Sequence, residues 1–134
     1  MDAASKILVV GGVLNLAFGL LTGLVLGGLR SRNPDADHKY LLSAHKAGLQ
    51  QGFMLLGLTF AVMLSPLSAS FETIAAALLA ASSFFLDVSA LANWRQGVCD
   101  EFKERSPGLQ LGGLSGLLAV AGLAILIFGV FRGL

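Results

Sequence analysis

The sequence predicts an all-α integral membrane protein, a single bundle of four transmembrane helices. Hydrophobic residues make up 55% of its 134 residues and charged residues only 13%, whereas a soluble domain carries about 25% charged residues. The chain also contains four long apolar stretches, and two short segments hold most of its charge. A net charge of +1 excludes the basic excess that nucleic-acid binding requires. The single cysteine, Cys99, excludes an intramolecular disulfide and forms no paired metal motif.

The first predicted span covers residues 7–29, which contain no charged residue. A helix of this length crosses about 30 Å of hydrocarbon at about 1.5 Å per residue. The stretch is too long for a signal peptide and no small-residue cleavage pattern follows it, so we expect a retained helix. Residues 30–44 are polar, and Asn33-Pro34 breaks the helix there.

Three further spans follow. The second covers residues 45–65 and ends at Ser65-Pro66, and the third covers residues 72–94. The third span ends on Trp94, a residue type enriched at the membrane interface. A second charged segment, residues 95–107, leads into a fourth span at residues 108–131. Four spans place both ends of the chain on one side of the membrane.

The distribution of lysine and arginine predicts the orientation, because cytoplasmic loops retain the positive excess. Lys6 and Arg132 are the only basic residues near the termini, and the short link between the second and third spans has none. The two charged loops hold six: Arg30, Arg32, Lys39, Arg95, Lys103 and Arg105. We therefore predict a protein of the cytoplasmic membrane, with loops 30–44 and 95–107 in the cytoplasm.

Two spans carry a glycine at every fourth position. In lipid, such stripes let helix backbones approach closely, which is a main source of helix association. The pattern fits packing within one bundle and contact between subunits equally well. Asn15, in the first span, is expected to join helices by a hydrogen bond. The stripes are Gly19, Gly23 and Gly27 in the first span, and Gly108, Gly112 and Gly116 in the fourth.

Strongly polar side chains within the spans are functional candidates, because each costs free energy in hydrocarbon. They lie toward the predicted cytoplasmic ends, which predicts a polar pocket near that face. Asp87 lies about 10 Å inside the end of its span at 1.5 Å per residue, too deep to reach the interface easily. The candidates are His45, Gln50, Gln51, Asp87 and Asn93.

Each candidate also has a purely structural interpretation. Asp87 could form a hydrogen bond or an ion pair with Arg95 or Lys46. His45 could be an ordinary helix-end histidine, and the two glutamines could join neighbouring helices. His38 lies in the charged loop, where we expect it to be solvated.

One segment resembles a known family. Residues 44–54, AHKAGLQQGFM, are similar to the helix signature of the styrene oxide isomerase and hydroxylaminobenzene mutase family of small membrane isomerases. The family pattern is Ala-His, five residues, Asn-Gly and a methionine shortly after; here Gln51 replaces the asparagine. Asn33-Pro34 and Ala92-Asn93-Trp94 also agree with it.

The resemblance implies a role for several residues. His45 would ligate a haem b held between the subunits of a homo-oligomer, a trimer in the isomerases, and Gln51 would help to hold the substrate. The tyrosine that those isomerases use, four residues beyond Asn93, is Gly97 in this chain. A five-coordinate ferric haem leaves one face open for a substrate oxygen. Acting as a Lewis acid, the iron would weaken the adjacent C–O or N–O bond.

Two functions from different classes follow. The first is a haem-dependent isomerase that rearranges a small hydrophobic aromatic, an epoxide or an aryl hydroxylamine, with Gln51, Asn93 and Asp87 as catalytic residues and His45 as the iron ligand. The alternative is a non-catalytic four-helix membrane protein, either an assembly partner or a small transporter in which Asp87 carries a proton or cation. A Soret band in the purified protein would favour the first function.

Overall fold

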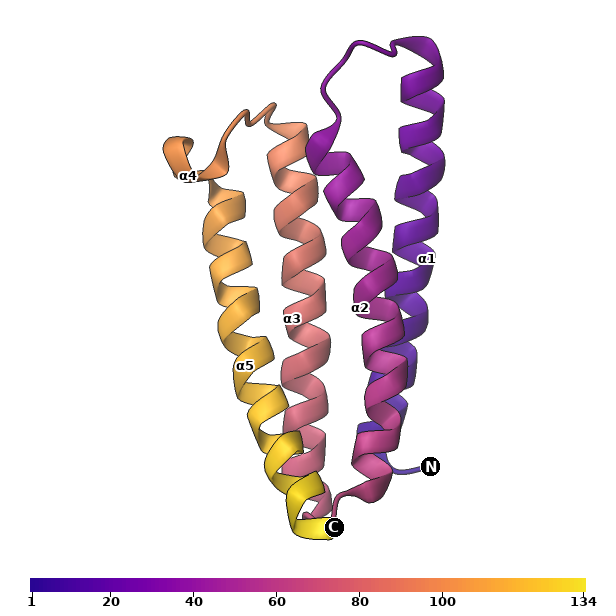
Figure 1. The fold of residues 1–134 in the computed structure, drawn as a ribbon, viewed down its shortest axis with the longest axis vertical. Helices are drawn as coiled ribbons and strands as arrows, with labels where there is room; N and C mark the ends of the chain where they lie inside the picture. Colours follow the sequence, from indigo (N-terminus) through magenta and orange to yellow (C-terminus); the bar gives the residue numbers. More distant parts are fainter.

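The computed structural model describes all residues 1–134 and contains only helices. Four helices are long and apolar enough to cross a membrane, which confirms the predicted all-α fold and a multi-pass membrane protein. They run alternately up and down, so that both termini lie at one end of the bundle (Figure 1). The helices are α1 (Ala3–Arg32), α2 (Lys39–Leu64), α3 (Ala69–Arg95), the short α4 (Glu101–Glu104) and α5 (Pro107–Gly133).

The predicted polar loops are more helical than their composition suggests. Residues 39–44 belong to α2, because no helix breaker follows Pro34 and the Asp37 carboxylate accepts a hydrogen bond from the Lys39 backbone N–H at 2.9 Å. The second loop contains α4, which the sequence did not predict. The Asp100 carboxylate caps α4, and Arg105 ends it in the left-handed conformation, with φ 48°.

Local hydrogen bonds also fix the ends of the long helices. The Asp2 carboxylate accepts a hydrogen bond from the Ser5 backbone N–H at 2.7 Å and so caps α1. This bond holds the pKa of Asp2 below its ordinary value. Ser106 caps α5 by accepting from the Leu109 N–H at 3.1 Å, with Pro107 at the first helical position.

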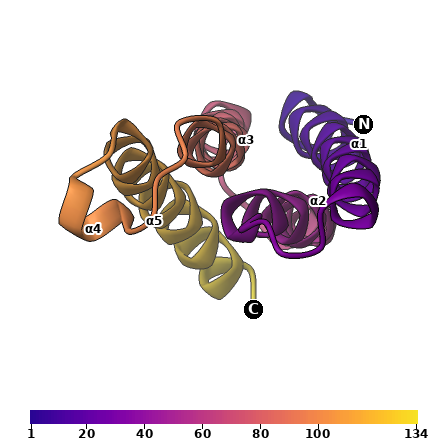
Figure 2. The same cartoon turned by 90° about the horizontal axis from the view of Figure 1, so that it is seen from above.

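The long helices form two pairs. α1 packs mainly on α2, α3 packs mainly on α5, and α3 also contacts both α1 and α2. Seen from above, α1 and α5 lie at opposite sides of the bundle, with α2 and α3 between them (Figure 2). Buried leucines from all four helices meet in the core: Leu8, Leu55, Leu79 and Leu126. Most of the larger apolar side chains outside this core point outward, as expected for a surface that faces lipid.

Glycines set the distance between α1 and α2. A Cβ at Gly48 would lie 2.8 Å from the Cα of Gly19, so no larger residue fits this crossing. The predicted stripe in α1 is therefore used within the bundle at Gly19, whereas Gly27 has nothing within 4 Å of a Cβ. The stripe in α5 divides in the same way: Gly108 contacts α3, and Gly116 is open.

Candidate functional site

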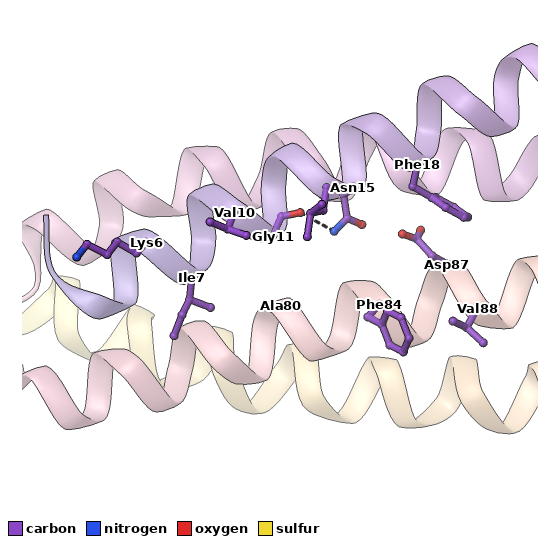
Figure 3. Close-up of a pocket in the computed structure, with 11 residues that line it drawn as sticks. Lys6, Ile7, Val10, Gly11, Asn15, Phe18, Ala80, Phe84, Asp87 and Val88 are labelled. Carbon is purple, nitrogen blue, oxygen red and sulfur yellow. Dashed lines mark hydrogen bonds between the residues drawn. The ribbon is translucent and has the colours of Figure 1, made fainter.

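A groove between α1 and α3 is the main hollow in the membrane-spanning part of the bundle. Its volume is about 630 Å³, within the range of ligand sites, about 300–1,000 Å³. Figure 3 shows its two walls, one from each helix. Apolar side chains dominate the lining, and Asn15, Asp87 and Lys6 are its polar members. The other lining residues are Ile7, Val10, Gly11, Leu14, Phe18, Ala80, Phe84 and Val88.

Asp87 and Asn15 direct polar groups into this groove (Figure 3). Each residue is 7% exposed. The Asn15 Nδ2 donates to the Gly11 carbonyl at 2.8 Å and to the Ser83 Oγ at 3.1 Å, which joins α1 to α3 as expected for a polar residue in a span. The Asn15 Oδ1 and the Asp87 Oδ1 are both enclosed and have no hydrogen-bond partner. Two unbonded acceptor oxygens are therefore buried in the wall of the groove.

No basic residue pairs with Asp87. The ion pair considered with Arg95 or Lys46 does not form, and the one ion pair in the chain joins Lys103 to Asp100 at 3.9 Å. Lys6 lies near the far end of the groove, about 18 Å along α1 from Phe18, at about 1.5 Å per residue. Asp87 is buried in the wall between α1 and α3, but it lines a largely apolar groove instead of the predicted polar pocket, and the ion-pair interpretation is wrong.

His45 lies against α1. Its Nδ1 is 2.6 Å from the Gly19 carbonyl oxygen, and a Cβ at Gly23 would lie 2.6 Å from the same nitrogen. Because a carbonyl oxygen only accepts, Nδ1 must carry the hydrogen. In the neutral ring this leaves Nε2 with a free lone pair, and Nε2 makes no hydrogen bond within the chain and is not enclosed by it.

Asn93 joins the ends of three helices. It is 1% exposed; its Nδ2 donates to the Glu101 Oε2 at 2.7 Å, and its Oδ1 accepts from the Ser106 hydroxyl at 2.7 Å. Its side chain also contacts the backbone at Gly108. The Tyr40 hydroxyl accepts from the Glu101 backbone N–H at 3.0 Å, which adds α2 to the network. Asn93 therefore acts here as a clamp between α3, α4 and α5.

A second cavity, of about 330 Å³, lies beside this clamp between α2, α3 and α5. Ala47 lines it, and Gln51 follows one turn later on the same face of α2. The Gln51 Oε1 is enclosed without a partner. Gln50 is exposed on the outer surface of α2.

The five polar candidates do not gather in one pocket. Asp87 and Asn93 lie six residues apart on α3, which separates their directions by about 120°. Asp87 points toward α1 and Asn93 toward α5, while His45 lies between α1 and α2. The structure thus forms three separate polar places: the α1/α3 groove, the His45 contact and the clamp.

Several residues of these places were not identified as functional from the sequence. Phe18 and Phe84 line the groove beside Asp87, but aromatic residues in a span are common and give no signal by themselves. His38 was expected to be solvated, and this is wrong: both its ring nitrogens are enclosed without a partner. Loop composition could not reveal this burial. Cys99 is an exposed free thiol, as expected.

Comparison of the chain with known protein families, with characterised proteins and with solved structures gives no match.

Proposed function

We propose that the protein is a membrane-embedded isomerase, with haem bound through His45, that rearranges a small lipid-soluble aromatic molecule. The observation that carries this proposal is the hydrogen bond from His45 Nδ1 to the Gly19 carbonyl. Metal-ligating histidines commonly donate their second ring N–H to a carbonyl or carboxylate, which fixes the tautomer and the ring orientation. The similarity of residues 44–54 to the isomerase signature points to the same histidine.

His45 and the residues around it would suit a ligand to haem iron. The ring is held between α1 and α2, Nε2 is free, and no second histidine reaches this place, since His38 is the only other one in the chain. None of the cavities described above is lined by His45, so the porphyrin would pack on the outer surface of the bundle. A second copy of the chain would then cover it, which agrees with the oligomer implied by the resemblance. The bound iron would supply Lewis-acid polarisation of a substrate oxygen.

The α1/α3 groove suits the aromatic substrate. Its walls are apolar, and Phe18 lines it directly before Gly19, the residue that His45 contacts. A small aromatic that partitions into lipid could enter sideways between the helices. Inside, the Asp87 carboxyl would take up or return a proton while the apolar walls exclude water. Rearrangement without water conserves every atom of the substrate, as an isomerase requires.

Gln51 and Asn93 contribute differently to this proposal. Gln51 retains an unbonded amide oxygen and remains a candidate for substrate contact from α2. Both polar ends of the Asn93 side chain are engaged in the clamp, which supports a positioning role for Asn93 in place of a catalytic one.

The test is the optical spectrum of the full-length protein purified with haem supplied during expression. The wild type should show a Soret band, His45→Ala should lose or strongly shift it together with any isomerase activity, and the matched His38→Ala variant should change neither. An unchanged spectrum in His45→Ala would overturn the assignment of the iron ligand.

A second candidate function is a non-catalytic protein in which Asp87 carries a proton or cation across the membrane. The unbonded, buried carboxyl favours it. A colourless wild type that moves protons in liposomes, with loss of transport in Asp87→Asn, would support this function over the isomerase.

A further inference from the structure

The unbonded oxygens of Asp87 and Asn15 define what the α1/α3 groove can bind. Buried polar atoms are nearly always hydrogen-bonded, so an enclosed atom without a partner needs an explanation. Here two such atoms occur in one groove, and both are acceptors: a carboxyl oxygen and an amide oxygen. The amide nitrogen of Asn15 is already used by Gly11 and Ser83, so the side chain cannot turn to offer a donor without breaking both bonds.

We propose that this groove is a binding site for a lipid-soluble amine, held as its ammonium ion between Asp87 and Asn15 with its apolar body along Phe18 and Phe84. An ammonium group carries several N–H donors and a positive charge. An ammonium that displaces the atoms covering these oxygens can donate to them and neutralise the carboxylate. This inference goes beyond the proposed isomerase and holds whether or not the chain binds haem.

The chain itself does not supply this positive charge. Lys6 is too far along α1, and Arg95 is exposed at the end of α3, about 12 Å from Asp87 at 1.5 Å per residue. An ionised carboxylate left alone in such a groove is costly, because no basic side chain of the protein compensates its charge. A cation from outside the chain removes that cost, so the groove selects for charge as well as for hydrogen-bond donors.

The rest of the groove selects for an apolar body of limited size. Eight of its lining residues are neither charged nor strongly polar: Ile7, Val10, Gly11, Leu14, Phe18, Ala80, Phe84 and Val88. Aromatic faces also attract cations, which favours an ammonium near Phe18. A molecule such as benzylamine combines the two requirements, whereas benzyl alcohol has a similar shape but no charge and a single donor.

The experiment measures binding of 4-fluorobenzylamine and 4-fluorobenzyl alcohol by fluorine NMR, using the full chain in detergent and without added haem. The amine should bind at least about tenfold more tightly than the alcohol, as expected for a hydrogen bond to a charged group. Asp87→Asn should abolish this preference. Equal binding of the two probes by the wild type, or no binding of the amine, would overturn the proposal; the first result would mean that Asp87 holds its own proton.

Glu72→Gln is the matched control, since Glu72 is also a buried carboxylate on α3 but does not line the groove. It should keep the full preference for the amine. If Glu72→Gln loses the preference as Asp87→Asn does, the amine responds to overall charge and the site assignment is wrong. The comparison of the two probes on the wild type needs no variant, so it tests the proposal even if Asp87→Asn does not fold. Because haem plays no part, failure here is distinct from failure of the spectral test on His45.

Discussion

The absence of a Cβ at glycines of α1 and α2 allows these helices to pack closely, and the position of the His45 ring depends on this close packing. Its ring occupies the space that a side chain at Gly23 would fill, and its Nδ1 bonds to the turn before, at Gly19. A glycine in the middle of a helix is unfavourable on propensity alone. Its presence at this position is explained by the room that the imidazole needs.

Alanine substitutions at two glycines of α1 should therefore change the stability of the bundle in opposite directions. Gly23→Ala should destabilise the bundle by about 1–3 kcal/mol, because the new methyl group collides with the His45 ring. Gly27→Ala, in the same helix, meets nothing within 4 Å and should be neutral or stabilising by up to about 1 kcal/mol through helix propensity. Thermal unfolding in detergent measures both. If the two variants shift the melting temperature equally, the packing of His45 on Gly23 is not as described.

At the scale of the helices, hydrogen bonds at the loop end of the bundle hold α3, α4 and α5 together. α4 has only four residues, and Asn93 and Tyr40 hold it in place through hydrogen bonds to Glu101. The same Asn93 accepts from Ser106, the residue that caps α5. One buried amide therefore fixes the end of one long helix, the loop and the start of the next.

Asn93→Ala should accordingly loosen this end of the bundle. It leaves the buried Ser106 hydroxyl without its partner, which costs about 1–3 kcal/mol, and it removes the hydrogen bond to the half-buried Glu101 carboxylate. We expect faster proteolytic cleavage within residues 96–106 and a lower melting temperature. Gln96→Ala, an exposed change next to the clamp, is the control and should cleave at the wild-type rate. Equal cleavage of both variants would argue against the clamp.

The start of α1 should depend on pH. The Ser5 backbone N–H, followed by the Ser5 hydroxyl, stabilises the ionised Asp2 carboxylate and lowers its pKa. Because the pKa of Asp2 is lowered in the folded protein, the cap is fully formed at any pH above the ordinary pKa of an aspartate. The cap is lost as the pH falls through the lowered pKa of Asp2. Amide exchange at the first turn of α1 should therefore be less protected in acid. Asp2→Asn can still cap the helix but does not titrate, so it should remove this pH dependence; a dependence that persists would point to another group.

The whole molecule is two helix pairs joined along α3, an arrangement that leaves a groove open between α1 and α3. The distribution of charge predicts the orientation of the bundle in the membrane. Six basic residues lie in the two loops or at the helix ends beside them, at one end of the bundle, and two lie near the termini. The six are Arg30, Arg32, Lys39, Arg95, Lys103 and Arg105, and the two are Lys6 and Arg132.

We predict that reporter fusions after Arg32 and after Arg105 report a cytoplasmic position and that a fusion after Leu134 reports an external one, because basic loops stay in the cytoplasm. The structure places both loops at one end of the bundle and both termini at the other. The two loop fusions must therefore report the same side of the membrane, and the fusion after Leu134 must report the opposite side. A cytoplasmic fusion at Leu134 would reverse the orientation, and a mixed result would contradict the four-span topology itself.

The sequence by itself determined the number of spans, because a stretch of about 20 apolar residues must form a helix once it is in lipid. It also marked Asp87 as buried between helices, since exposure to lipid at that depth is too costly. Only the tertiary structure decided which neighbour each polar residue meets. Residues six apart on a helix point about 120° apart, so Asp87 faces α1 and Asn93 faces α5, and which helix lies on which side depends on packing between residues far apart in the chain. For this reason the single polar pocket predicted from the sequence becomes a groove, a histidine contact and a clamp.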